Sequence, residues 1–370
     1  MNTALKEEEP QLKDALLAWY DRCRRSLPWR DDPSPYHVWI SEIMLQQTRV
    51  EAVKGYYARF LERLPDIRSL AEADEDVCLK LWEGLGYYSR ARNLQKAARQ
   101  IMTEYGGNMP GSSAELIRLP GIGPYTAAAI ASIAFGEKIP AIDGNLLRVF
   151  SRLTLYEQAI KTPAAAAAAR SFFLEEMPDQ RPGDFNQALM DLGAGLCTPG
   201  GAPSCEECPL RGRCRARAQD RAKDLPVMPA KKARKIEKRT ILVIRDDDRI
   251  LLRRRPAGGL LAGLYEFPNE KGWLSEEEAV RRAGDYGCQP LHIRALPAAK
   301  HVFTHREWHM HGYEIRIGSF PEVPEDPDRT GEDTAPAGEC FIATIGDIEE
   351  KYALPGALAA YNPRALSVRG

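Results

Sequence analysis

The chain has 370 residues, more than one ordinary domain holds, and its 44% hydrophobic and 28% charged residues exclude a disordered protein. No stretch approaches the run of about eighteen apolar residues that a transmembrane helix needs, and the acidic N-terminus lacks the features of a secretory signal. The net charge of −1 argues against a protein that holds nucleic acid through overall charge alone. We therefore expect a cytoplasmic protein of at least two domains, without a membrane partner, whose cysteines serve as ligands before disulfides.

The charge is distributed unevenly along the chain. Residues 201–255 hold 17 Lys and Arg against 8 Asp and Glu, whereas residues 321–350 hold 1 Arg against 10 acidic residues. The basic stretch is suited to contact phosphates while the acidic stretch stays in solvent. A linker with a solvated charged face explains the same pattern equally well, so charge alone leaves both interpretations open.

The first half of the chain has the pattern of helices. Between residues 10 and 195, apolar residues recur at a spacing of three to four, and the breaks fall at Pro and Gly. Thr162, followed by Pro163 and a run of alanines, predicts an N-cap and the first turn of a helix. Residues 222–239 contain Pro and a basic run, which indicates a linker.

The second half has a mixed pattern. Residues 240–255 predict two strands around an Asp-rich turn, and residues 301–318 predict a strand pair. Ser275, followed three residues later by Glu278, predicts a capping box at the start of a helix. The predicted organisation is an all-α domain (1–221), a linker (222–239) and an α+β domain (240–370).

Four of the eight cysteines lie close together with the spacing C-x7-C-x2-C-x5-C. They are Cys197, Cys205, Cys208 and Cys214. Four thiolates this close indicate a bound metal ion or an iron–sulfur cluster. A closed zinc site suits four thiolates equally well, although zinc sites more often pair two C-x2-C knuckles and this segment has one.

Two glycines, Gly121 and Gly123, stand between two helical patterns in the segment Leu119–Thr126. Glycines at this spacing allow a tight turn with exposed backbone N–H groups. Together with the N-terminus of the next helix, these groups form an anion site suited to a DNA phosphate. An ordinary helix–helix turn would show the same pattern.

This hairpin, the cysteine spacing and a downstream aspartate together resemble the endonuclease III and MutY superfamily of helix-hairpin-helix DNA glycosylases. Asp143 stands where that superfamily has its aspartate, and it also fits the N-cap of the following helix. The resemblance implies a [4Fe-4S] cluster on the four cysteines. The usual superfamily spacing is C-x6-C-x2-C-x5-C, so this chain has one extra residue between Cys197 and Cys205. The intervening segment carries no basic residue, and we expect it to contribute less to DNA contact than in relatives.

The segments Leu27–Arg30 and Val38–Thr48 closely resemble the MutY family of adenine DNA glycosylases. Cleavage of the adenine glycosidic bond needs a neutral carboxylic acid, kept neutral by burial, to protonate N7 of the base. It also needs an ionised carboxylate to stabilise the oxocarbenium-like sugar. The resemblance implies that Glu42 is the acid and Asp143 the stabiliser or transient nucleophile. A solvent-facing helix residue is the alternative for Glu42, but its neighbours are largely apolar.

Two further residues follow from the same resemblance. Tyr125 and Asn145 match positions that orient and support Asp143. Relatives that also cut the DNA strand place a lysine nucleophile at the position of Tyr125. Without that amine no Schiff base to the sugar forms, so we expect a monofunctional glycosylase.

Other positions match residues that contact the base or the DNA. Trp29, Arg30 and Gln187 match the adenine pocket, where the Gln187 amide can pair with an adenine edge as donor and acceptor. Gln47 and Tyr87 match the residues that wedge into the gap left by the flipped base. By itself, Tyr87 would be interpreted as a core tyrosine after a glycine turn.

The C-terminal part, from about residue 236 to 365, resembles the MutT-like domain of the MutY family, most clearly at Leu261–Pro268. The glutamates in Ser275–Arg282 do not form the R-E-x-x-E-E pattern that a catalytic Nudix helix needs for magnesium. We therefore expect a reading domain without hydrolase activity. By resemblance, its 8-oxoguanine-reading residues are Phe303, Thr304 and His305, where many relatives have Ser in place of Thr304.

The resemblance covers nearly the whole chain. It implies a multidomain protein with an all-α helix-hairpin-helix glycosylase domain, an iron–sulfur cluster loop, and an α+β MutT-like domain. The implied activity is excision of adenine mispaired with 8-oxoguanine or guanine in double-stranded DNA, by a monomer associated with a bacterial-type nucleoid. Three alternatives are an endonuclease III-like pyrimidine glycosylase with lyase activity, a DNA-binding protein without catalysis, and a nucleotide-pool hydrolase.

Overall fold

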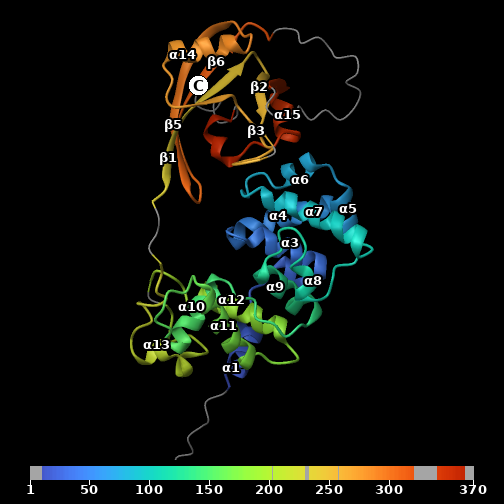
Figure 1. The fold of residues 1–370 in the computed structure, drawn as a ribbon, viewed down its shortest axis with the longest axis vertical. Helices are drawn as coiled ribbons and strands as arrows, with labels where there is room; N and C mark the ends of the chain where they lie inside the picture. The colour runs from blue at the N-terminus through green and yellow to red at the C-terminus, as the bar shows by residue number, and fades with distance from the viewer. Residues whose placement is uncertain (1–10, 202, 230–232, 257, 321–339, 363–370) are drawn as a thin grey trace, which may run out of the picture. The chain divides into compact units, whose positions relative to one another are not determined.

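The computed structural model describes residues 11–201, 203–229, 233–256, 258–320 and 340–362. The chain divides into two compact units, one formed by residues 1–72 and 93–231 and the other by residues 73–92 and 232–370. The first unit is helical, and the second is built on a β-sheet (Figure 1). Within the described residues, no helix has the length and apolar character needed to cross a bilayer.

Helices of three to four turns alternate with shorter ones in the first unit. They are α1 (Leu12–Cys23), α2 (Pro28–Asp31), α3 (Pro35–Leu45), α4 (Val50–Arg63), α5 (Ile67–Glu72), α7 (Ser89–Glu104, which begins in the other unit), α8 (Ser113–Leu116), α9 (Pro124–Phe135), α10 (Gly144–Thr154), α11 (Pro163–Glu176), α12 (Pro182–Gly195) and α13 (Arg215–Ala218). The prediction for α11 is confirmed, because the Thr162 side chain accepts a hydrogen bond from the Ala165 N–H at 3.2 Å.

The main core of this unit lies where α1, α10, α11 and α12 meet. Leu16, Phe150, Phe173, Phe185 and Leu189 are all buried there. Burial of each such side chain stabilises the fold by about 1.5–3 kcal/mol relative to exposure. The core therefore fixes α10 and α12, the two helices that carry Asn145 and Gln187.

The second unit contains one mixed seven-stranded sheet. Its strands are β1 (Lys235–Arg245), β2 (Arg249–Arg254), β3 (Tyr265–Glu266), β4 (Asn269–Lys271), β5 (Pro290–Val302), β6 (Arg306–Ile317) and β7 (Cys340–Thr344). The main order is β3-β2-β1-β6-β5, with β4 paired to β1 and β7 paired to β2. Only the β1–β6 pair is parallel among the described strand pairs. The two strands predicted around the Asp-rich turn are confirmed as β1 and β2. The strand pair predicted within residues 301–318 is only partly right, because that segment holds the last two residues of β5 and the single strand β6, and β5 begins at Pro290.

Strand β1 begins earlier than the sequence predicts. Lys235 already pairs with Arg306 of β6, and the register continues without interruption to Arg245. The last residues of the predicted linker 222–239 therefore belong to the sheet, because the parallel partner extends that far. Residues 230–232 of that linker, and residues 321–339 of the acidic stretch, lie outside the described residues.

Helix α14 (Glu276–Asp285) begins with the predicted capping box. The Ser275 side chain accepts from the Glu278 N–H at 3.2 Å, and the Glu278 side chain accepts from the Ser275 N–H at 2.8 Å. Glu276, Glu277 and Glu278 are exposed. The positive end of the helix dipole lies at this N-terminus, so three negative side chains there stabilise the helix. The unit also contains α15 (Ile345–Glu350) and the 3₁₀ helix η2 (Gly356–Tyr361).

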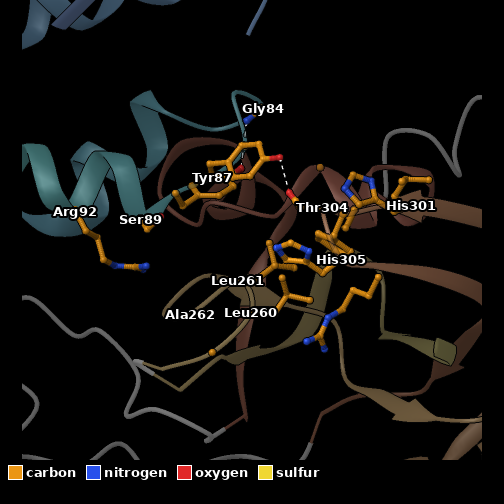
Figure 2. A pocket seen from close by; sticks show the side chains of 18 residues that line it. Gly84, Tyr87, Ser89, Arg92, Leu260, Leu261, Ala262, His301, Thr304 and His305 are labelled. Atoms are coloured by element: carbon orange, nitrogen blue, oxygen red, sulfur yellow. Dashed lines mark hydrogen bonds between the residues drawn. The ribbon is translucent and has the colours of Figure 1, made fainter. Parts of the chain in front are cut away.

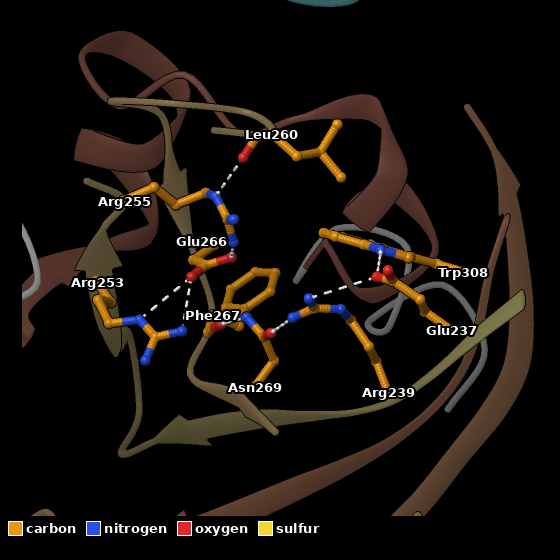
Figure 3. Close-up of polar contacts among 9 residues, drawn as sticks. All are labelled: Glu237, Arg239, Arg253, Arg255, Leu260, Glu266, Phe267, Asn269 and Trp308. Carbon is orange, nitrogen blue, oxygen red and sulfur yellow. Dashed lines mark hydrogen bonds and ion pairs between the residues drawn. The ribbon is translucent and has the colours of Figure 1, made fainter. Parts of the chain in front are cut away.

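A buried ion cluster holds β3 against β2. Arg253 and Arg255 both point at Glu266, whose exposed fraction is 1% (Figure 3). Nearby, Arg239 donates to the side-chain oxygen of Asn269. A buried carboxylate persists only when it is paired, so the two arginines are what permits Glu266 to sit inside the domain.

Residues 73–92 pack on the sheet-containing unit through α6 (Glu75–Leu81) and the turn that follows it. The Tyr265 hydroxyl donates to Asp76 at 2.9 Å, and the Leu354 N–H donates to Glu83 at 2.8 Å. Lys80 donates to the Ile348 carbonyl at 2.9 Å. The prediction assigned this segment to the helical domain 1–221. These polar contacts instead attach it, and Tyr87 with it, to the sheet-containing unit.

Candidate active site

A cavity of about 200 Å³ lies within the helical unit. Its lining includes all the residues predicted for catalysis and for the adenine pocket: Trp29, Arg30, Glu42, Tyr125, Asp143, Asn145 and Gln187. These side chains come from α2, α3, α9, α10 with its cap, and α12. The fold therefore gathers at one place residues that are far apart in the sequence.

Glu42 is held inside the protein by α3. This helix begins at the Ser34 cap and Pro35, and most of its residues are buried. Glu42 is 5% exposed, and the Tyr125 hydroxyl donates to its Oε2 at 2.7 Å. Burial raises the pKa of Glu42 to about 7, an effect that the Tyr125 hydrogen bond opposes and the nearby Asp143 charge reinforces. A large share of Glu42 is thus protonated near neutral pH, as a general acid requires.

Asp143 is the N-cap of α10, and its two carboxylate oxygens have different partners. Oδ1 accepts from the Leu146 N–H at 2.7 Å, and Oδ2 accepts from the Asn145 side chain at 2.9 Å. Burial raises the pKa of Asp143, while these hydrogen bonds act in the opposite direction by stabilising the charged form. The capping role and the position at the cavity are therefore compatible in one residue.

Helix α10 also connects the cavity to the cysteines. Arg148 donates from Nη2 to the side-chain oxygen of Asn145 at 2.9 Å and from Nε to the Cys197 carbonyl at 2.7 Å. One turn later, Arg152 donates to the Cys197 sulfur at 3.2 Å. Sequence reasoning missed both arginines. Their spacing of four residues, which places them on one helix face, was the available signal.

The four cysteines line a common cavity of about 30 Å³, which also contacts Leu196 and Ala222. The donors are all sulfur, and a guanidinium lies beside one of them. Within the described residues, no group of three or more His, Cys, Asp or Glu side chains is arranged to hold a single metal ion. Cys23 and Cys78 lie elsewhere, the first exposed and the second buried.

The predicted hairpin lies between α8 and α9. Gly121 has φ +79°, and a Cβ there would lie 2.7 Å from the Cβ of Asn93, so two separate constraints require glycine. Gly123 is the N-cap of α9, and Pro124 occupies the first turn. The free N–H groups of this helix start lie beside the turn, as an anion-binding hairpin requires.

The two predicted wedge residues share an unusual backbone conformation. Gln47 has φ 60° and Tyr87 has φ 48°, and only five non-glycine residues in the described part of the chain have positive φ. Both side chains are exposed. Such strain persists only where the surrounding structure enforces it, and it is frequent at functional sites.

A second cavity, of about 470 Å³, lies in the sheet-containing unit. It is lined by Tyr87 and by the predicted reading loop, Phe303–His305, which connects β5 to β6 (Figure 2). The Tyr87 hydroxyl and the Thr304 hydroxyl form a hydrogen bond of 2.9 Å. The ring of Phe303 packs edge-on against Trp308 at 5.0 Å, which anchors the loop. The sequence predicts separate roles for Tyr87 and Thr304, and the structure places the two residues in contact.

The sequence prediction also missed polar and sulfur-bearing residues at the first cavity, and an aspartate that pairs with one of its lining residues. Arg25 and Met190 line it, and the Tyr125 hydroxyl lies 3.8 Å from the Met190 sulfur. Asp191 forms an ion pair with Arg30 at 2.8 Å. An aspartate on a helix gives no sign in the sequence of whether it faces solvent or a buried arginine.

Comparison with known families and proteins follows the same division of the chain. Residues 40–173 match the HhH-GPD superfamily of base excision DNA repair proteins, and residues 239–361 match the NUDIX domain. These matches confirm the predicted helical and α+β architecture.

Individual relatives cover most of the chain. It is 36% identical over 359 residues to the adenine DNA glycosylase of Homo sapiens. The matched region covers 80% of this chain and 65% of the human protein. Identity is 37% over 294 residues with the adenine DNA glycosylase of Buchnera aphidicola subsp. Baizongia pistaciae (strain Bp), covering 78% of this chain and 82% of the relative. The chain thus spans slightly less than two thirds of the human protein. Among solved structures, a thermostable thymine-DNA glycosylase superposes on 56% of this chain and 95% of its own, with 30% identity and a TM-score of 0.52.

Proposed function

Because the chain belongs to the adenine DNA glycosylases, a family of DNA N-glycosylase hydrolases, we propose that it removes adenine mispaired with 8-oxoguanine or guanine from duplex DNA. The observation that carries the proposal is the pairing of Glu42 with Asp143 at one cavity. About half of the Glu42 carboxyl group is neutral near pH 7, while Asp143 is held by hydrogen bonds that favour its charged form. Two carboxyl groups in different protonation states are what glycosidic cleavage requires.

The proposed reaction begins with a proton. Glu42 donates it to N7 of the flipped adenine, which makes the base a better leaving group, and the glycosidic C–N bond then breaks. Asp143 stabilises the positive charge that develops on the sugar, either as an ion pair or through a transient bond. Water supplies the hydroxyl that replaces the base, and the proton that it loses returns to the Glu42 carboxylate. Asn145 and Tyr125 hold the two carboxyl groups in place through the hydrogen bonds described above.

The lack of an amine at residue 125 supports a monofunctional enzyme. The Tyr125 hydroxyl is engaged with Glu42, and burial raises the pKa of Tyr125 well above its ordinary value, so it stays a protonated donor. A phenol of this kind forms no Schiff base with the opened sugar. We therefore propose that strand cleavage is not part of the reaction.

Adenine must leave the helix stack before it reaches this cavity. We propose that Gln47 and Tyr87 fill the gap, and that the hairpin at Gly121 and Gly123 holds a phosphate. The adenine itself would lie between Trp29, Arg30 and Gln187. The positive φ values at Gln47 and Tyr87 support the first role, because strained, exposed residues are common where side chains are projected into a ligand.

The reading loop is proposed to distinguish 8-oxoguanine from guanine in the opposite strand. Thr304 offers a hydroxyl, and His305 is exposed beside it. 8-Oxoguanine differs from guanine at the edge formed by O8 and N7. O8 is an additional acceptor, and N7–H is a donor where guanine has the acceptor N7. A hydroxyl both donates and accepts, so it suits that edge.

We propose that Cys197, Cys205, Cys208 and Cys214 hold a [4Fe-4S] cluster, as the resemblance implies. The all-sulfur donor set and the Arg152 N–H on Cys197 suit an anionic iron–sulfur group. When bound, such a group fixes the loop against α10. Iron and zinc analysis of the purified protein tests this, since zinc without iron would contradict the assignment.

The activity is tested by base release from duplexes that place adenine opposite 8-oxoguanine, guanine or thymine. In single turnover, the protein should release adenine fastest opposite 8-oxoguanine, more slowly opposite guanine, and least from the normal pair opposite thymine. Strand breaks should appear only after alkali. Strand cleavage without alkali, trapped by borohydride, would instead support an endonuclease III-like lyase.

Thr304→Val tests the reading role, because it keeps the shape of the side chain and removes the hydroxyl. We expect the preference for 8-oxoguanine over guanine to fall about tenfold, which corresponds to one lost hydrogen bond. Thr304→Ser keeps the hydroxyl and should preserve the preference. An unchanged preference in the valine variant would assign the discrimination to other residues.

A further inference from the structure

Asp191, on α12, is nearly enclosed, since 3% of its side chain is exposed. Arg30 donates to Oδ2 from one terminal nitrogen at 2.8 Å and to Oδ1 from the other at 2.9 Å. Arg25 adds its Nε to Oδ1 at 2.7 Å and its backbone N–H to Oδ2 at 3.3 Å. Both carboxylate oxygens therefore have two donors, and the two-point contact fixes the plane of the Arg30 guanidinium.

One nitrogen of Arg30 remains unpaired. Its Nε is buried and has no hydrogen-bond partner among the described residues. The terminal nitrogens are occupied by Asp191 and by the Arg25 carbonyl, at 3.1 Å from Nη1. Arg30 as a residue lines the cavity, so this unpaired N–H lies close to the place where a ligand is expected. Ring nitrogens of a purine are acceptors of the right kind.

On the basis of the adenine excision proposed above, we propose that Asp191 is a positioning residue for Arg30. It holds the two terminal nitrogens of the guanidinium, so that the side chain keeps its place at the adenine pocket and the positive charge is kept from engaging Glu42. Asp191 and Gln187 are four residues apart on α12 and so lie on the same helix face. Gln187 lines the pocket, and Asp191 holds the Arg30 guanidinium beside it.

The surrounding charges give this anchoring a consequence. The groups that face Glu42 are Tyr125 from α9, Asp143 from the cap of α10, and Arg30 from α2. After burial, Asp143 raises the pKa of Glu42 and Arg30 lowers it. A guanidinium released from Asp191 is free to approach Glu42, and a closer positive charge would remove the proton that the reaction needs.

Asp191 itself does not take part in proton transfer in this scheme. The Arg30 guanidinium also lies over the Tyr20 ring, 5.5 Å from its centroid. Although burial alone would raise the pKa of Asp191, the hydrogen bonds and charges of Arg30 and Arg25 hold it below its ordinary value. The carboxylate therefore stays ionised across the pH range in which Glu42 titrates.

The experiment is the pH profile of adenine release in single turnover by Asp191→Asn, from a duplex with adenine opposite 8-oxoguanine. We expect the alkaline limb, where activity falls as Glu42 loses its proton, to move about one pH unit toward acid. At a pH above that limb, the rate should then be about tenfold lower than in the unmodified protein. A purely structural ion pair would instead lower the rate equally at every pH.

Two further variants separate the explanations. Asp191→Asn combined with Arg30→Met removes the released cation, so the limb should return to its original position or beyond. Asp184→Asn is the matched control, since Asp184 lies on the same helix, pairs with Arg181 at 2.8 Å and is not among the residues that line the cavity. Its limb should not move.

Should Asp191→Asn fail to fold, Arg30→Lys tests the same idea. Lysine keeps the charge but lacks the two-point fork, so a smaller shift in the same direction is expected. A stationary limb in the folded variants would overturn the role of Asp191. If the unmodified protein releases no adenine, the proposed function fails, and the role of Asp191 fails with it.

Discussion

Glu42→Gln is expected to lower adenine release in single turnover by about 10²–10⁴-fold, the usual contribution of a general acid. The amide has nearly the same shape as the protonated carboxyl group but no proton of comparable acidity to give. The measurement is base release beside duplex binding, and binding should persist. Glu51→Gln, at an exposed position on α4 that pairs with Lys54, is the control and should retain full activity.

The same variant has an opposite effect on stability. In the folded protein Glu42 keeps its proton up to about pH 7, whereas the unfolded chain releases it near 4.5. The free energy of unfolding therefore falls as pH rises through this window. Above about pH 7 the folded protein bears the whole destabilisation that comes from burying an ionised Glu42 carboxylate. Removing the group removes this destabilisation. Thermal unfolding should show Glu42→Gln as more stable than the unmodified protein above pH 7, but not near pH 4.5.

In the base-release measurement, adenine excision by Glu42→Gln at an undiminished rate would remove Glu42 from the mechanism.

Asp143→Asn should lower adenine release by about 10²–10³-fold, because it removes the negative charge that faces the developing sugar cation. Asparagine is as good an N-cap as aspartate, so α10 should still begin at the same place. The variant thus separates the two roles of this residue. Circular dichroism and the melting temperature should stay close to those of the unmodified protein while the rate falls.

Two comparisons complete this prediction. Asp143→Ala removes the cap as well, and should lower the melting temperature in addition to the rate. Asp66→Asn is the matched control, because Asp66 also accepts a backbone N–H three residues later, at 2.7 Å from Ser69, and is not among the residues that line the cavity. Excision by Asp143→Asn at an undiminished rate would show that the charge is dispensable.

Much of the candidate site could be predicted from the sequence because its residues belong to local motifs. Glu42 lies in a helix of apolar residues, and its burial follows from that pattern. Asp143 precedes a helical pattern in the position of a cap, and the capping contact is present. Local spacing also predicted the capping box at Ser275 and the strands that flank the Asp-rich turn.

What the sequence could not show depends on contacts between distant residues. Tyr87 and Thr304 are 217 positions apart, and their hydrogen bond exists only because α6 packs on the sheet of the second unit. Asp191 meets Arg30 across 161 positions. No local pattern distinguishes an aspartate that anchors a buried arginine from one that faces water. The early start of β1 likewise follows from its partner β6 and not from its own composition.

The hydrogen bond between Tyr87 and Thr304 bears on how discrimination arises under the proposed reading role. In the protein alone each hydroxyl already has a partner, so contact with DNA exchanges one hydrogen bond for another and adds little attraction. When the correct base replaces the lost partner, the exchange is nearly neutral. When it does not, two hydroxyl groups are left facing a surface that cannot pair with them. Selectivity then comes from weaker binding of duplexes with the wrong opposite base, and not from stronger binding of duplexes with 8-oxoguanine.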